Sequence, residues 1–169
     1  TEIGAHAAAQ AGRSLKPFTA ELGGNAANIL FADADLDRAI HPVISAFVFN
    51  AGQFCMAGPR LLVERSVDGV VLGILKDAVP QVPFGDIADP ATVVGPLASR
   101  VQLEKVASMV ERARAAGARV VTGGHAVEHD GGFFYAPTVL ADLDPDAEIV
   151  VDEVFGPVLT VQPFDTEDE

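Results

Sequence analysis

Short β-rich runs alternate along this chain with longer amphipathic segments, and this alternation constrains the fold more than any other feature. Strands are predicted over 60–64, 119–122, 133–140 and 158–164. The best marked helix lies between Ser99, which has capping-box spacing to Gln102, and Gly117. Strands that alternate with helices form mainly parallel sheets. We therefore expect an α/β fold with a largely parallel open sheet and helices on both faces.

A second helix is expected over 67–79. Its apolar residues recur at helical spacing, which predicts one buried face. That face is made by Val70, Val71, Ile74, Leu75 and Ala78.

The composition fits one packed domain and excludes some partners. The 169 residues are 49% hydrophobic, which is enough for a single core. A net charge of −13 disfavours nucleic acid and anionic membranes. No apolar run reaches the roughly 18 to 20 residues of a spanning helix. A single cysteine permits no intrachain disulfide, so we expect a cytoplasmic protein with no nucleic-acid or membrane partner.

The N-terminal part predicts a helix tail over 3–11, stopped by Gly12, and strand-like pieces over 18–22 and 27–31. Glu21 then lies at a strand end beside Gly23 and Gly24, which permit close backbone approach. Its carboxylate is either a base aimed into a cleft or a solvated loop charge.

The only cysteine, Cys55, lies in the glycine-flanked loop 50–58. A helix that starts in the acidic stretch 33–37 precedes it, and Pro42 either kinks this helix or begins a new one. The apolar run 43–49 should then deliver Cys55 from the interior. The thiol is either a small buried hydrophobe or a nucleophile, since its reactivity decides its role.

Two patterns resemble metal sites without meeting their requirements. His125 and His129 lie among glycines and an aspartate, which is typical of a solvent loop. Asp142, Asp144 and Asp146 imitate an EF-hand loop, but Ala147 stands where that loop needs glycine. We predict no metal site.

Together these segments resemble the aldehyde dehydrogenase superfamily nearly end to end. The matching segments are Glu21-Leu22-Gly23-Gly24, Asn28 with 31–37, 49–55, Gly95-Pro96-Leu97, Pro137-Thr138-Val139, 153–158 and Pro163-Phe164-Asp165. Two positions depart from the common family pattern: Asn25-Ala26-Ala27 replaces a triplet such as Lys-Ser-Pro, and Pro42 falls in a helix that usually lacks proline.

The resemblance implies NAD(P)-dependent oxidation of an aldehyde to a carboxylic acid, with NAD or NADP as cofactor. Cys55 would be the nucleophile that forms a thiohemiacetal and then a thioester, and its backbone N–H would stabilise the oxyanion. Glu21 would be the general base for thioester hydrolysis. Glu153 would bind the ribose of the nicotinamide half, with Phe155 packed nearby. The substrate would be a small-molecule aldehyde, and the full-length enzyme a homo-oligomer.

The resemblance also implies that the chain is truncated at both ends. Residues 1–4 resemble the end of the family's cofactor-binding turn, which makes Gly4 a candidate cofactor contact. We expect residues 1–15 to be a remnant of the cofactor-binding domain and residues 16–169 to be a partial catalytic domain.

Three readings of the isolated chain stay open. The first is a catalytic segment with little or no dehydrogenase activity, because most of the cofactor site is missing. The second is a noncatalytic, self-associating truncated domain with a vestigial site. A third is that Cys55 alone retains esterase or redox reactivity.

Overall fold

A five-stranded sheet forms the centre of the computed structural model, which describes residues 2–169. Its strands run in the order β1-β2-β7-β6-β3, and every neighbouring pair is parallel except β3 with β6. The five strands are β1 (Ala27–Leu30), β2 (Arg60–Glu64), β7 (Val158–Phe164), β6 (Thr138–Ala141) and β3 (Arg119–Thr122). A separate hairpin pairs β4 (Ala126–Val127) with β5 (Phe134–Tyr135).

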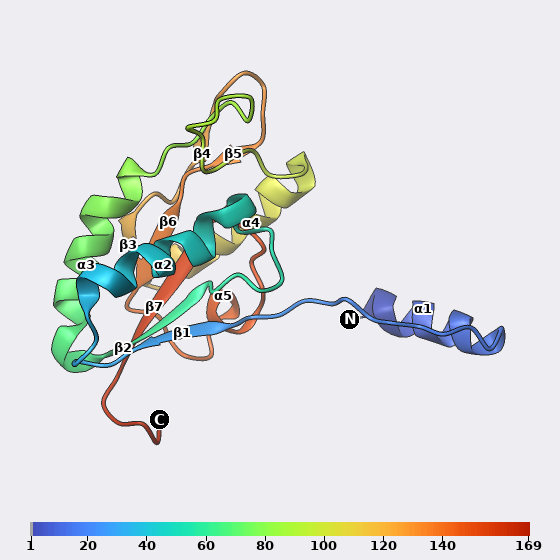
Figure 1. Cartoon of the computed structure of the whole chain (residues 1–169), viewed down its shortest axis with the longest axis horizontal. Helices are drawn as coiled ribbons and strands as arrows, with labels where there is room; N and C mark the ends of the chain where they lie inside the picture. The colour runs from blue at the N-terminus through green and yellow to red at the C-terminus, as the bar shows by residue number, and fades with distance from the viewer. Residues whose placement is uncertain (1) are drawn as a thin grey trace.

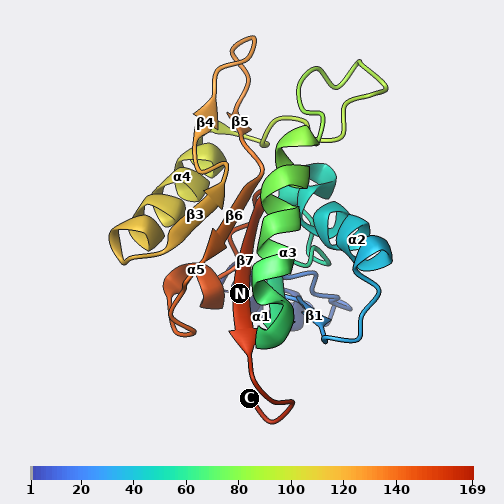
Figure 2. The ribbon, with the colours of Figure 1, turned by 90° about the vertical axis from the view of Figure 1, so that its left-hand side faces the viewer.

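Helices cover both faces of this sheet, which confirms the expected fold class (Figures 1 and 2). Figure 2 shows α2 (Leu36–Val48) and α3 (Arg65–Ala78) on one face, and α4 (Arg100–Ala115) with the short α5 (Glu148–Val151) on the other. The first helix, α1 (Glu2–Arg13), lies apart from these layers and has no buried residue (Figure 1). Two short 3₁₀ helices, η1 (Phe49–Gly52) and η2 (Val79–Gln81), end α2 and α3.

The core lies between the sheet and its helices. Alternate residues of β2 point into it, because successive side chains of a strand face opposite sides. Fully buried side chains of large volume include Phe47, Leu61, Leu75, Leu140 and Leu159. Within residues 2–169, no helix combines the length and the apolar character needed to cross a bilayer.

Helix α2 passes through Pro42 without ending there. Asp35 caps its N-terminus by accepting a hydrogen bond from the Arg38 N–H at 3.3 Å. Buried Ile40, Val43 and Phe47 on either side of the proline pack the helix onto the core. Tertiary packing therefore outweighs the backbone hydrogen bond that a proline inside a helix removes.

Helices α3 and α4 follow their predicted bounds within two residues, but the prediction for Val70 is wrong. Val70 is 57% exposed, whereas Leu72, which was not assigned to the apolar face, is buried. The buried stripe of α3 contains Val71, Leu72 and Leu75, and Val70 lies about 145° around the helix from its centre. Helix α4 begins as expected, with the Ser99 hydroxyl accepting from the Gln102 N–H at 3.2 Å.

Two strand predictions need correction. Residues 18–22 form no strand: they have no regular secondary structure and are exposed, so Glu21 does not lie at a strand end. Strand β1 pairs with β2 on one side, and this N-terminal segment has no strand of the described chain to pair with. The expected strand over 133–140 is divided into β5 and β6 by Ala136 and Pro137, because proline has no N–H to donate to a ladder.

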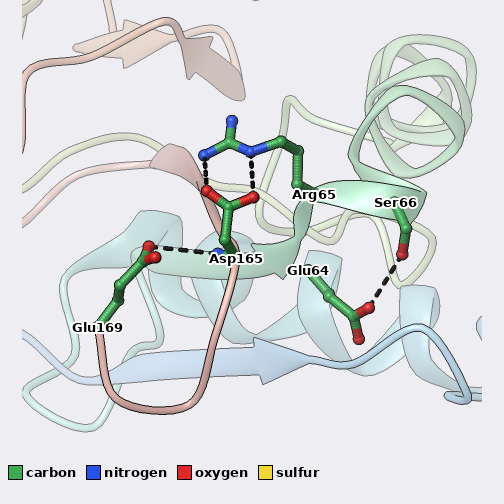
Figure 3. A network of polar contacts seen from close by, with 5 residues as sticks. All are labelled: Glu64, Arg65, Ser66, Asp165 and Glu169. Atoms are coloured by element: carbon green, nitrogen blue, oxygen red, sulfur yellow. Dashed lines mark hydrogen bonds and ion pairs between the residues drawn. The ribbon is translucent and has the colours of Figure 1, made fainter.

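The end of β7 is tied to the start of α3 by exposed polar contacts (Figure 3). The Arg65 guanidinium donates two hydrogen bonds to the Asp165 carboxylate, of 2.5 and 2.8 Å. The Asp165 N–H donates to Glu169 at 3.2 Å, and the Ser66 hydroxyl donates to Glu64 at 3.1 Å. The paired geometry holds the C-terminal turn against the edge of α3.

Candidate functional site

One cavity of about 530 Å³ collects four of the five candidate site residues. Glu21, Cys55, Glu153 and Phe155 all line it, although they come from three separate stretches of the chain. The other lining residues are Leu22, Gly23, Gln53, Phe54, Gln102 and Lys105.

The loop that carries Cys55 leaves α2 through an unusual turn. Asn50, Ala51 and Gly52 have φ values of 50°, 53° and 70°, three consecutive residues in the left-handed region. Only glycine adopts this conformation freely, so the surrounding contacts must hold the other two. Cys55 follows this turn by three residues, is exposed and lines the cavity. Cys55 is thus not a buried hydrophobe, although its loop is anchored by buried Ala51 and Gly52.

Gly23 and Gly24 bring the Glu21 segment close to the two other parts of the site. A Cβ atom on Gly24 would lie 3.0 Å from the carbonyl oxygen of Cys55. A Cβ atom on Gly23 would overlap the Glu153 carboxylate. The absence of side chains here lets an exposed segment run directly between the cysteine loop and Glu153.

Helix α4 holds the main chain around Glu153 and Phe155. Lys105 Nζ donates to the Glu153 carbonyl oxygen at 2.8 Å. Gln102 Nε2 donates to the carbonyl oxygens of Val154 and Phe155, at 3.1 and 2.7 Å. Phe155 itself has φ of 56°, so this turn too is kept in the left-handed region by its contacts.

Sequence reasoning missed Gln102 and Lys105. Gln102 was explained by its capping spacing, yet its side chain reaches across to the 153–155 turn. Lys105 brings a positive charge into the lining, although the sequence near Cys55 offers none. Their position in the sequence could have indicated a role outside the core, because both residues lie near the start of a helix whose buried stripe is formed by other side chains.

Gly4 does not line the cavity. It lies in the first turns of α1, where a Cβ atom would come within 2.6 Å of the Leu22 side chain. Leu22 does line the cavity, so Gly4 contacts a lining residue but not the cavity itself. Thr1, the first of the four residues that resemble the end of the cofactor-binding turn, lies outside the described residues.

A second, mainly apolar cavity of about 510 Å³ adjoins the first at Phe54, which lines both. Its other lining residues are Pro42, Ser45, Ala46, Phe49 and Met56. The Phe49 and Phe54 rings pack edge to face, with centroids 5.4 Å apart. The cavity that carries charged groups and the cavity that carries none thus meet at Phe54, the residue before Cys55.

The two histidines that raised a metal hypothesis have separate environments. His125 Nδ1 lies 3.1 Å from the Gly123 carbonyl oxygen, and the His129 ring packs edge to face on Phe134 at 5.2 Å. Among residues 2–169, no group of three or more His, Cys, Asp or Glu side chains lies close enough to hold a metal ion.

Comparison with known proteins identifies the family. A sequence model described as the aldehyde dehydrogenase family matches residues 1–169. The chain belongs to the aldehyde dehydrogenase family.

Solved structures of family members match both fold and sequence. The NAD-dependent aldehyde dehydrogenase of Sinorhizobium meliloti is 38% identical, with a TM-score of 0.94 over 99% of this chain and 33% of its own. Betaine aldehyde dehydrogenase of Staphylococcus aureus in complex with NAD+ is 37% identical, with a TM-score of 0.93 over 99% of this chain and 34% of its own. An NAD+ complex of aldehyde dehydrogenase from Bacillus cereus is 37% identical, with a TM-score of 0.92 over 98% and 34%. The chain therefore spans about a third of the length of these relatives.

Proposed function

We propose that the chain is the catalytic segment of an enzyme that oxidises an aldehyde to a carboxylic acid with NAD or NADP. The shared cavity carries this proposal, because it joins a thiol, a carboxylate that can act as a base and a second carboxylate suited to ribose hydroxyls. Oxidation through a covalent cysteine adduct needs the first two within reach of one carbon atom.

In this mechanism the Cys55 thiolate attacks the carbonyl carbon of the aldehyde. A C–S bond forms, and the carbonyl electron pair moves to oxygen, where the Cys55 backbone N–H donates a hydrogen bond. A bound nicotinamide cofactor would accept the hydride that leaves this carbon as the thioester forms.

Glu21 completes the cycle as general base. Its carboxylate takes a proton from water, and the resulting hydroxide attacks the thioester carbon. The C–S bond then breaks, which releases the carboxylic acid and returns the Cys55 thiolate. Exposure of Glu21 in the 18–24 segment gives this carboxylate access to solvent water.

The residues of the cavity fit the nicotinamide half of such a cofactor. Carboxylate oxygens accept hydrogen bonds from vicinal hydroxyls, and the Glu153 carboxylate lies against Gly23 rather than behind a side chain. Phe155 and Leu22 offer apolar surface beside it, and Lys105 offsets part of the negative charge of Glu21 and Glu153. Glu153 and Phe155 would hold the group, and Gly4 would contribute through its contact with Leu22.

The domain assignment is part of the same proposal. Residues 1–15 would belong to a cofactor-binding domain and residues 16–169 to a catalytic domain. The lack of buried residues in α1 supports this division, because a helix of the catalytic domain would bury an apolar face against that domain's core. The whole enzyme would be a homo-oligomer.

A noncatalytic, self-associating domain is the alternative. It is favoured by large apolar side chains at the surface, including Ile29 at 55%, Phe49 at 60% and Met56 at 72% exposure. Sedimentation at several concentrations separates the two readings. A concentration-independent monomer that binds no hydrophobic dye counts against self-association.

The direct test is a chimera in which this chain replaces the matching third of the Bacillus cereus enzyme. We expect aldehyde-dependent reduction of NAD or NADP, loss of that activity in Cys55→Ala, and an accumulating acyl-enzyme in Glu21→Gln. The 169-residue chain alone should give little or no reduction, and robust reduction by it would overturn that expectation. If the chimera does not fold, turnover of p-nitrophenyl acetate by the chain and by its Cys55→Ala variant still tests Cys55 as an acyl acceptor.

A further inference from the structure

Gln53 connects the cysteine loop to a distant part of the chain. Its side-chain oxygen Oε1 accepts a hydrogen bond from the Ala98 N–H at 2.8 Å. Ala98 lies in the turn that leads into α4, 45 residues further along the chain. Gln53 and Cys55 are separated by one residue, so this hydrogen bond restrains the chain close to the thiol.

Gln53 also spans the left-handed turn through hydrogen bonds with Asn50, made by its side chain and its backbone. Gln53 Nε2 and the Gln53 backbone N–H both donate to the Asn50 carbonyl oxygen, at 3.3 and 3.1 Å. In return, Asn50 Nδ2 donates to the Gln53 carbonyl oxygen at 2.8 Å. Asn50 and Ala51 keep a positive φ only where the surroundings determine it strongly, and these bonds between Asn50 and Gln53 contribute to that.

We propose that Gln53 is a positioning residue, which ties the cysteine loop to the start of α4 and so sets the position of the Cys55 thiol and backbone N–H. Gln53 does so through hydrogen bonds to Ala98 and Asn50, and it takes no part in bond making or breaking. The effect on catalysis rests on the proposed function of Cys55. The hydrogen bonds that connect the cysteine loop to the start of α4 are a property of the fold and do not depend on that function.

The start of α4 also holds the other side of the cavity. Gln102, in the first turn of this helix, donates to the carbonyl oxygens of Val154 and Phe155. The thiol loop and the Glu153 turn are therefore fixed to the same few residues. A fixed distance between the two is what transfer between a substrate on Cys55 and a cofactor at Glu153 requires.

Hydrogen exchange measured residue by residue tests the tie in the intact chain. In Gln53→Leu, the Ala98 N–H should exchange about tenfold faster, because it loses its only acceptor among residues 2–169, and the Ala57 N–H of the cysteine loop should also exchange faster. Gln53→Glu keeps an acceptor oxygen and should restore protection of Ala98. The Leu97 N–H, which donates to the Phe133 carbonyl oxygen, is the internal control.

Chemical reactivity of Cys55 tests the consequence. Acylation by p-nitrophenyl acetate needs the oxyanion to meet the Cys55 N–H, whereas alkylation by iodoacetamide needs only an accessible thiolate. In Gln53→Leu we expect acylation to slow by about tenfold while alkylation stays within about twofold, a split that loss of folded protein would not produce. Gln162→Leu is the matched control, since the Gln162 side-chain oxygen is buried in β7 without a partner in the described chain.

Unchanged hydrogen exchange at the Ala98 and Ala57 N–H groups in Gln53→Leu would disprove the claim that Gln53 fixes the cysteine loop to the start of α4. Faster exchange with an unchanged ratio of acylation to alkylation overturns the positioning role. If the unmodified chain shows no acylation beyond that of Cys55→Ala, the proposed role of Cys55 fails instead, and the exchange data alone then decide whether Gln53 fixes the loop.

Discussion

Gly52 packs against Gly156 backbone to backbone, and this contact joins the cysteine loop to the turn that follows Phe155. A Cβ atom on Gly52 would overlap the Gly156 carbonyl and lie 2.8 Å from Pro157 N. Gly52 also has φ of 70°, in the region that glycine adopts without strain. The two loops that line the cavity can approach this closely only because neither carries a side chain at the crossing.

Gly52→Ala should therefore destabilise the chain strongly. Strained φ and overlap with rigid backbone together predict a loss of about 3 kcal/mol in the free energy of unfolding. Urea denaturation measures it. Gly69→Ala is the control: Gly69 lies in α3 with open space around it, and alanine there should stabilise the chain by about 0.5 to 1 kcal/mol. A neutral Gly52→Ala would contradict the close crossing.

Gln102→Leu should loosen the turn that carries Phe155. Two carbonyl oxygens lose their side-chain donor, which predicts a loss of about 1 to 2 kcal/mol in the free energy of unfolding. Gln81→Leu, at an exposed position of η2, should stay within about 0.5 kcal/mol of the unmodified chain. Equal effects of the two substitutions would mean that the Gln102 contacts contribute nothing to stability.

Trypsin should first cut the chain after Arg13. This residue ends α1, and the segment 14–24 beyond it is exposed. The product 14–169 should unfold within about 2 °C of the intact chain, because α1 buries no residue. Cleavage after Arg112, which lies in α4 and pairs with Glu148, is the reference. Cleavage at Arg13 as slow as at Arg112 would show that α1 is held as firmly as the core.

The elements of the core were predictable because their signals are local. Ser99, Gln102 and Gly117 lie within one helix, and periodicity alone indicates which side chains of α4 face inward. The N-terminal segment was not predictable in the same way, since residues 18–22 have β-rich composition but no neighbouring strand. A strand requires a partner, and composition does not reveal one.

The sequence indicated residues that share one cavity, but not the side chains that hold the surrounding loops in place. Cys55, Glu21 and Glu153 belong to motifs that resemble the family, and all three line one cavity. Gln53 and Gln102 act through hydrogen bonds to residues 45 to 53 positions away. Such bonds depend on how helices and loops meet in space, which sequence spacing does not encode.

Asp68 should lower the stability of the chain at neutral pH. It lies on the buried side of α3 near Val71 and Leu72, and its Oδ1 is buried without a partner in the described chain. Burial raises the pKa of Asp68 above its ordinary 3.8, and the charge of Asp142 adds to this, while Arg119 and Arg65 oppose it. The folded state thus binds the proton more tightly than the unfolded state, so stability falls as pH rises from 3.8 through the folded pKa.

Asp68→Asn should remove this penalty. The variant should be more stable than the unmodified chain in urea at pH 7, and the gain should shrink toward about pH 3.5. Asp142→Asn is the opposite control: a hydrogen bond from Arg119 lowers the pKa of Asp142, so its contribution is present above pH 3.8 and is lost as pH falls through the folded pKa. Asp142→Asn should therefore destabilise the chain at pH 7. A loss of stability in Asp68→Asn at that pH would instead mean that attraction to Arg119 outweighs the burial of Asp68.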